Sequence, residues 1–89
     1  MPDSLSLIVY TLEFCPHCEI LKKYLRTKGH SYSEKDLSTA EALTELRING
    51  VFVNEAPVLQ RGDDFFTSDD MFPGGEFDEK KVSAFLSGE

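Results

Sequence analysis

A Cys-x-x-Cys motif at a strand-to-helix junction constrains this chain more than any other feature. Both cysteines of the chain, Cys15 and Cys18, lie in the run Phe14-Cys15-Pro16-His17-Cys18. The apolar run 5–12 before it predicts a buried first strand, and residues 16–28 after it predict an amphipathic helix. Zinc sites, haem attachment sites and redox enzymes all use Cys-x-x-Cys, but a dithiol between a first strand and a first helix indicates a pair that cycles with a disulfide.

The same placement predicts different roles for the two sulfurs. A helix that begins near Pro16 puts Cys15 at its N-terminus, where unpaired N–H groups and the helix dipole favour the thiolate. We therefore expect the pKa of Cys15 to lie below the free value of about 8.5. Pro16 suits this position because its ring presets a helical φ and its missing N–H needs no partner. Cys18, one turn later, is expected to be shielded and to act as the resolving thiol.

Two neighbouring side chains are candidates for tuning the pKa of Cys15. Lys22 lies four residues after Cys18 and adds positive potential to the same helix. His17 offers a donor beside the thiolate, which would stabilise the reduced form and make the disulfide a stronger oxidant. The sequence leaves open that His17 is a solvated spacer, because one histidine beside a motif is weak evidence.

Length and composition place limits on the class of protein. Eighty-nine residues with 40% hydrophobic content predict a single folded domain, 1–89. Two cysteines are too few for the multi-bridge framework of a small secreted scaffold. The first apolar stretch is too short to span a bilayer and lacks the basic flank of a signal peptide, so we expect a cytoplasmic protein with no membrane role.

The net charge of −7 is concentrated in the second part of the chain, where residues 55–89 hold nine acidic and three basic residues. A nucleic-acid partner is therefore not expected, because little of the surface could neutralise a phosphate backbone. Acidic faces that keep a small monomer soluble are the simplest explanation of the charge. A basic partner docking on the acidic end is an open alternative.

Periodicity and turn residues predict the remaining elements. We expect a strand at 31–36, then a helix that is capped by Ser38 or Thr39 and ends at Ile48, then a strand-like run at 51–53. Strands at 58–60 and 65–67 should follow, joined by a hairpin turn at 61–64. A breaker at 72–75 then precedes a last helix at 77–86. The order β-α-β-α-β-β-α predicts an α/β fold with a mixed four-stranded sheet flanked by three helices.

The expected topology also places the dithiol. Right-handed crossovers should put the first and third strands side by side and parallel, with the last hairpin as an antiparallel edge. Ligands bind beyond the carboxyl ends of parallel strands in such sheets, and Cys15 follows the first strand.

The chain resembles the glutaredoxins and small glutaredoxin-like electron donors of the thioredoxin superfamily over nearly its whole length. The resemblance rests on Tyr10-Thr11-x-x-x-Cys15-Pro16-His17-Cys18, on the element order and on Ala56-Pro57-Val58 downstream. It implies a thioredoxin-like fold in which Pro57 is cis and packs beside the dithiol. It also implies that the Ala56 backbone pairs with an extended substrate, such as glutathione or a cysteine-bearing segment. The alternative for Pro57 is an ordinary proline at the start of a strand.

Two positions depart from the family pattern. Typical glutaredoxins carry a lysine that helps bind a glutathione carboxylate, three residues before the first cysteine, where this chain has Leu12. Their Gly-Gly-Asp segment corresponds, by distance from Pro57, to the run Thr67-Ser68-Asp69-Asp70, although a longer hairpin would bring Gly74-Gly75 with Asp78 to that place. We prefer the first register.

In that register each residue has an expected role. Ser68 would N-cap a short helical turn whose N–H groups could bind a carboxylate. Asp69 or Asp70 could bind an amine, or both could be solvated turn residues.

The leading hypothesis is a thiol–disulfide oxidoreductase. Cys15 attacks a disulfide of a protein or small molecule, Cys18 releases the product, and glutathione as co-substrate, another small thiol or a thioredoxin-reductase-like donor regenerates the dithiol. The absence of the family's lysine at Leu12 favours the thioredoxin-reductase-like donor over glutathione. The candidate substrate-binding residues are Phe14, Ala56, Pro57, Ser68, Asp69 and Asp70.

Metal binding is the alternative from another class. Cys15 and Cys18 could ligate zinc with His17 or His30, or two chains could share an iron–sulfur cluster. A closed zinc site within one chain is disfavoured because no second Cys-x-x-Cys or His pair exists. A non-catalytic interaction module is disfavoured because both sulfurs are present.

Overall fold

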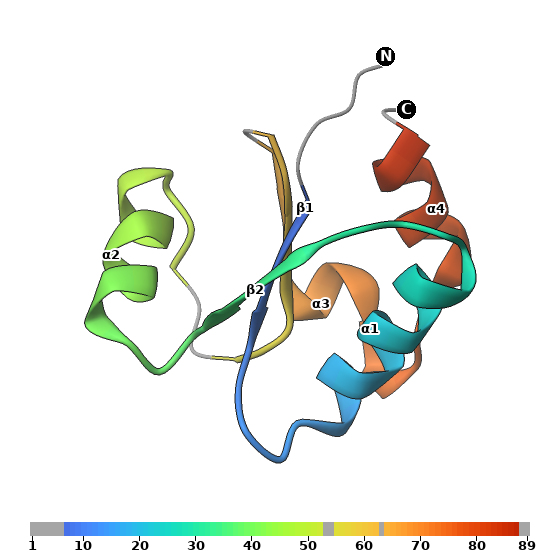
Figure 1. Cartoon of the computed structure of the whole chain (residues 1–89), viewed down its shortest axis with the longest axis horizontal. Helices are drawn as coiled ribbons and strands as arrows, with labels where there is room; N and C mark the ends of the chain where they lie inside the picture. The colour runs from blue at the N-terminus through green and yellow to red at the C-terminus, as the bar shows by residue number, and fades with distance from the viewer. Residues whose placement is uncertain (1–6, 53–54, 63, 88–89) are drawn as a thin grey trace.

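The computed structural model describes residues 7–52, 55–62 and 64–87. Expectations for Leu5, Ser6, Val53, Asn54 and Asp63 lie outside the described residues. The elements, in chain order, are β1 (Leu7–Thr11), α1 (Pro16–Thr27), β2 (Ser33–Asp36), α2 (Ala40–Ile48), β3 (Val58–Arg61), β4 (Asp64–Phe66), α3 (Ser68–Met71), a 3-10 turn (Pro73–Gly75) and α4 (Glu79–Ser87) (Figure 1).

The predicted mixed sheet is confirmed, and it has the order β2-β1-β3-β4. β1 pairs with β2 in parallel and with β3 in antiparallel, and β4 is an antiparallel edge strand. The first and third strands are therefore adjacent as expected, but the expectation that they run parallel is wrong.

The reason for the reversed strand lies after α2. The chain turns back at Gly50, whose φ of 79° is left-handed, and the Val51 N–H donates to the Leu46 carbonyl at 2.8 Å. β3 therefore starts at the end of the sheet where β2 finishes, since Asp36 of β2 lies opposite Thr11 of β1. β3 must then run opposite to β1, and its first residue, Val58, lies opposite Tyr10 near the end of β1.

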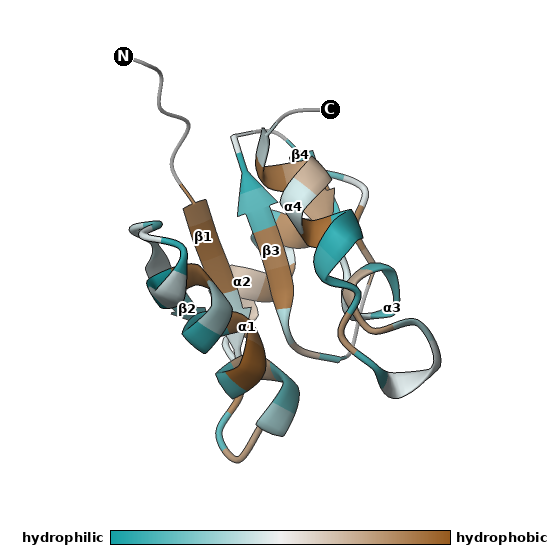
Figure 2. Ribbon diagram, turned by 90° about the vertical axis from the view of Figure 1, so that its right-hand side faces the viewer, coloured by the Kyte–Doolittle hydropathy of each residue, from teal (hydrophilic) through white to brown (hydrophobic). Residues whose placement is uncertain are grey.

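The core has two halves because β1 is buried on both faces. Alternate side chains of a strand point to opposite faces. Leu7 and Val9 pack with α1, α3 and α4, whereas Tyr10 packs with α2. Figure 1 shows the same arrangement, with α2 on one side of the sheet and α1, α3 and α4 on the other. In Figure 2, β1 is hydrophobic over its first part, as a central strand should be, and β3 turns hydrophilic toward its end.

Local sequence explains where most helices begin and end. Cys15 is the N-cap of α1, and Gly29 follows the helix with a φ of 79°. Thr39 caps α2 by accepting a hydrogen bond from the Ala42 N–H at 3.1 Å. α4 begins at Glu79 rather than at the predicted Phe77, whose ring packs edge-on against Tyr24.

Two further differences concern short segments. Val51 and Phe52 form no strand, and the Phe52 side chain is 77% exposed. The four-residue helix α3 adds a fourth α-helix to the three expected, because Thr67 and Asp70 cap a turn after β4. None of the described helices has the length and apolar character that crossing a membrane requires.

Candidate active site

The two cysteines form a disulfide at the start of α1, with their Cα atoms 5.2 Å apart. Cys15 is the N-cap and Pro16 the first helical residue, as the sequence predicts. The Cys18 N–H donates to the Cys15 sulfur at 3.1 Å, so an unpaired amide of the first turn is aimed at that sulfur. The side chain of Cys18 is 1% exposed, whereas Cys15 is half-buried. An external disulfide can therefore reach Cys15 but not Cys18.

Phe14 precedes the dithiol in an unusual backbone conformation. Its φ of 54° is left-handed, a region that bulky residues avoid because it costs of order 1–3 kcal/mol. Its side chain is 97% exposed. The loop therefore presents an aromatic ring to solvent beside Cys15, which suits a substrate contact better than a core role.

The start of β3 lies beside the same loop. Pro57 is cis and fully buried, in agreement with the resemblance, and Val58 pairs with Tyr10 at the end of β1. Ala56 and Cys15 line one cleft. An antiparallel β3 brings this about, because a parallel β3 would begin at the opposite end of β1.

The cleft around Cys15 has a volume of about 700 Å³. Three segments far apart in sequence form it: the dithiol loop with the start of α1, the segment before β3, and the chain from α3 through the 3-10 turn. The lining residues are Leu12, Glu13, Phe14, Cys15, Pro16, His17, Glu55, Ala56, Ser68, Asp69, Phe72, Gly74 and Gly75. Both registers considered from the sequence therefore reach the cleft, one through Ser68 and Asp69, the other through the two glycines.

The residues around α3 have different roles from those expected. Thr67, not Ser68, is the N-cap, and Ser68 is buried at 8% exposure. The Asp70 carboxylate accepts hydrogen bonds at 3.0 Å from both the Thr67 N–H and the Thr67 hydroxyl, which forms a capping box. Asp70 is thus committed to holding the turn, and Asp69, which is exposed and lines the cleft, is the carboxylate available to a ligand.

His17 is not a free spacer. Its ring stacks on Phe72, with centroids 4.1 Å apart and planes 10° apart. Among the described residues no hydrogen bond joins His17 to Cys15, so the predicted donation to the thiolate is not made in this disulfide state. Phe72 is 4% exposed and belongs to the core cluster of β1 and α1. The stack therefore connects the motif to the segment after α3, which also lines the cleft.

Lys22 is engaged with two carboxylates. Its ammonium lies 2.9 Å from Glu19 and 3.4 Å from Glu34, and its side chain is 14% exposed. The hydrogen bond to Glu19, together with the charge of Glu34, raises the pKa of Lys22 above its ordinary value. Lys22 is thus charged but paired, and its effect on the Cys15 pKa stays a prediction.

Tyr10, the first residue of the family-like motif, supports the sheet. It is fully buried and its hydroxyl donates to the Gln60 side-chain oxygen at 2.7 Å. Burial, and secondarily the charge of Glu45, raises the pKa of Tyr10, so the phenol stays neutral at ordinary pH.

Three residues of the cleft were missed by sequence reasoning: Glu13, Glu55 and Phe72. Glu13 could have been found, because it lies between the first strand and Cys15. Glu55 could have been found in the same way, because it directly precedes Ala56 and Pro57, which the resemblance places beside the dithiol. Phe72 had no signal, since its place depends on how α3 packs.

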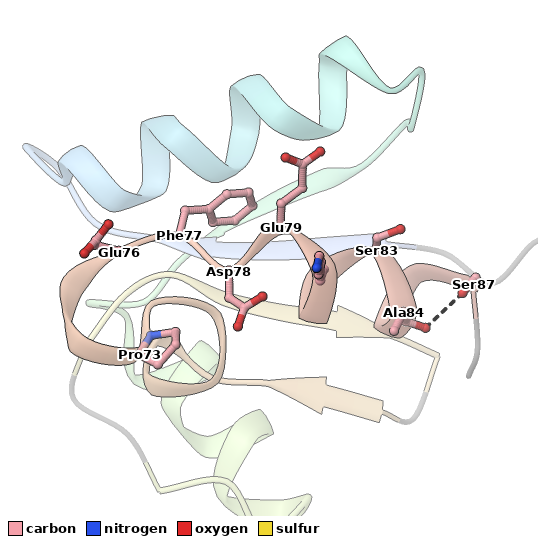
Figure 3. Close-up of a pocket in the computed structure, with 9 residues that line it drawn as sticks. Pro73, Glu76, Phe77, Asp78, Glu79, Ser83, Ala84 and Ser87 are labelled. Carbon is pink, nitrogen blue, oxygen red and sulfur yellow. Dashed lines mark hydrogen bonds between the residues drawn. The ribbon is translucent and has the colours of Figure 1, made fainter.

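A second hollow, of about 880 Å³, lies along α4 (Figure 3). Figure 3 shows Glu76, Phe77, Asp78 and Glu79 leading into the helix, with Pro73 on the neighbouring turn. The described residues that line it include no cysteine or histidine. Likewise, no group of three or more His, Cys, Asp or Glu side chains suited to a metal ion occurs within residues 7–52, 55–62 and 64–87.

A dithiol at the N-terminus of α1, with one sulfur accessible and a cis-proline at the start of the neighbouring strand, defines a thioredoxin-fold thiol–disulfide reductase. Comparison with known families narrows this class. The glutaredoxin family model matches residues 7–65, and the chain belongs to the glutaredoxin family.

A curated relative agrees with this assignment. Over 62 residues the chain is 31% identical to the N-acetyl-S-hydroxy-L-cysteine reductase of Bacillus subtilis (strain 168), a match that covers 70% of this chain and 67% of that protein. The chain is therefore a glutaredoxin-like thiol–disulfide reductase with Cys15 and Cys18 as its dithiol. Membership of the family implies disulfide substrates and a glutathione-type thiol as reductant.

Proposed function

We propose that Cys15 is the nucleophile and Cys18 the resolving thiol in the reduction of disulfides. The Cys15 thiolate attacks one sulfur of the substrate, a mixed disulfide forms, and the other substrate sulfur leaves as a thiolate that takes up a proton. Cys18 loses its proton and attacks Cys15, which releases the second thiol and leaves the Cys15–Cys18 disulfide. The observation that carries this assignment is the contrast in exposure, with Cys18 at 1% and Cys15 half-buried.

The substrate would lie in the cleft across the Cys15 sulfur. Phe14 offers an exposed aromatic contact, and the Ala56 backbone offers strand-like pairing. Pro57 removes a competing N–H donor at the start of β3. Ser68 and Asp69 also line the cleft.

The oxidised dithiol would be returned to its reduced form by glutathione or by a thioredoxin-reductase-like donor. The family favours a glutathione-type thiol, whereas Leu12, in place of a lysine, favours the reductase. Reduction of a small neutral disulfide should be measured with glutathione and its reductase, then with a thioredoxin reductase. Turnover with at least one system supports the proposal, and turnover with neither contradicts it.

The B. subtilis relative favours a second candidate, reduction of a small sulfenic acid. The Cys15 thiolate would attack the sulfenic sulfur, and hydroxide would leave with a proton as water. Cys18 would then release the thiol from the mixed disulfide. The net change is one sulfenic acid and one dithiol to one thiol, one disulfide and one water, and the test is thiol release from an S-hydroxylated thiol by the reduced protein.

A further inference from the structure

The charged residues that line the dithiol cleft are of one sign. Glu13 comes from the loop before Cys15, Glu55 from the segment before β3, and Asp69 from α3. All three are exposed at the surface of the cleft. They come from separate segments, so the fold surrounds one reactive sulfur with three carboxylates.

No lysine or arginine balances these charges among the described residues that line the cleft, and His17, stacked on Phe72, is the one lining residue that can gain a positive charge. The position where related proteins carry a lysine is Leu12, which also lines the cleft. Lys22 is bonded to Glu19 and Glu34, so its charge is largely neutralised. The α1 N-terminus contributes positive potential, but its amide is directed at the Cys15 sulfur itself.

We propose that Glu13, Glu55 and Asp69 make this reductase select disulfides that carry positive charge beside the sulfur, and disfavour those flanked by carboxylates. The proposal rests on the proposed function, because it concerns which disulfide Cys15 attacks. Partial enclosure by low-dielectric walls strengthens the field of like charges in a cleft and raises the local concentration of the opposite charge. The fitting substrates are amine-bearing small disulfides and disulfides in basic protein segments. Glutathione, with two carboxylates and one ammonium, fits less well.

Three small disulfides with the same two-methylene arms separate charge from shape: cystamine, which is cationic, bis(2-hydroxyethyl) disulfide, which is neutral, and 3,3′-dithiodipropionate, which is anionic. The reduced full-length protein is mixed with an excess of each, quenched by alkylation, and its remaining thiols are counted by mass spectrometry. The same disulfides are reacted with dithiothreitol, a neutral dithiol. The rate constant of each disulfide with the protein is divided by its rate constant with dithiothreitol. This ratio removes differences in the intrinsic reactivity of the disulfides and the attraction of any thiolate for a cationic disulfide.

The expected result is a normalised preference for cystamine over dithiodipropionate of about tenfold at low salt, the size that a few exposed charges within about 10 Å can produce. The preference should shrink toward one as NaCl approaches about 1 M, where screening acts within about 3 Å.

A triple variant, Glu13→Gln, Glu55→Gln and Asp69→Asn, should lose most of the preference. Its matched control, Glu41→Gln, Glu45→Gln and Asp64→Asn, removes three exposed acids that do not line the cleft and should keep it. The control has the same net charge, so it separates the local field from the overall charge. Single variants of Glu13 and Glu55, each expected to reduce the preference about twofold, serve if the triple variant does not fold.

A normalised ratio near one in the unaltered protein, a ratio that survives in the triple variant, or an equal loss in the control would overturn the charge proposal. Failure to react with all three disulfides would instead refute the proposed function, and the charge proposal with it.

Discussion

His17 lies flat against Phe72, and this stack connects the redox motif to the segment after α3, which lines the same cleft. The ring planes differ by 10° and the centroids are 4.1 Å apart. Phe72 is itself buried and packs against Phe77. A side chain that could donate to the Cys15 thiolate is thus held by an aromatic contact in the core. The stack restrains a residue that could otherwise tune the dithiol.

Replacement of Phe72 should therefore change the redox potential of the dithiol. In Phe72→Leu the His17 ring is free to donate a hydrogen bond to the Cys15 thiolate, which stabilises the reduced form. The reduction potential should rise by about 30 mV, the equivalent of one hydrogen bond to a charged group. Equilibration with glutathione buffers measures it. Phe72→Tyr keeps the stack and should keep the potential, and a Phe72→Leu value equal to the unaltered protein would show that the stack restrains nothing.

Replacement of Cys15 and replacement of Cys18 should affect disulfide reduction in different ways. Cys15→Ser should abolish disulfide reduction, because Cys18 at 1% exposure cannot reach an external substrate. Cys18→Ser should still attack but accumulate a mixed disulfide on Cys15, visible by mass spectrometry of the intact protein. Accumulation of the adduct in Cys15→Ser instead would reverse the roles.

The reactivity of Cys15 should depend on pH in a direction set by its place on α1. Because the thiolate is the nucleophile, the rate of attack should rise as pH passes through the Cys15 pKa and level off above it. An N-cap sulfur that accepts the Cys18 N–H should have a midpoint below about 8.5, measured as thiolate absorbance of the reduced protein. If the charge of Lys22 lowers the Cys15 pKa, Lys22→Met should raise this midpoint. An unchanged midpoint would show that Lys22 only forms its ion pairs and does not affect the Cys15 pKa.

Replacements of the two neighbouring aspartates of α3 should have different effects on the free energy of unfolding. Asp70→Ala removes the capping box at Thr67 and should lower the free energy of unfolding by about 1 kcal/mol. Asp69→Ala, at an exposed position, should change stability by less than about 0.5 kcal/mol. Urea unfolding measures both. An equal decrease in the free energy of unfolding in the two variants would contradict the assignment of Asp70 to the helix cap.

A lysine at the cleft should improve the use of glutathione. Leu12→Lys adds a cation where the lining is acidic, so the KM for glutathione should fall about threefold or more, with a smaller effect at high salt. Leu12 is half-buried, and a lysine can bury its aliphatic stem there while its ammonium reaches the cleft. Leu12→Met, which keeps the volume without a charge, is the control and should not lower the KM.

The sequence determined the chemistry and most of the local structure. An apolar β-branched run followed by Cys15, Pro16 and a helical apolar stripe predicts a strand, an N-cap and a helix, since these depend on neighbouring residues alone. The greater accessibility of Cys15 and the shielding of Cys18 followed from the same helix geometry. Ala56-Pro57 was found through resemblance, and its cis bond agrees with it.

Tertiary structure decided what joins these pieces. The direction of β3 depends on the turn at Gly50 and on the end of the sheet at which β3 begins, which no local pattern encodes, so the parallel expectation failed. The capping role of Asp70 depended on which hydroxyl, Thr67 or Ser68, the short turn would use. The stack of His17 on Phe72 and the meeting of Glu13, Glu55 and Asp69 join residues remote in sequence. Such contacts arise when helices pack on a sheet, and the sign of the charge around Cys15 is therefore a property of the fold.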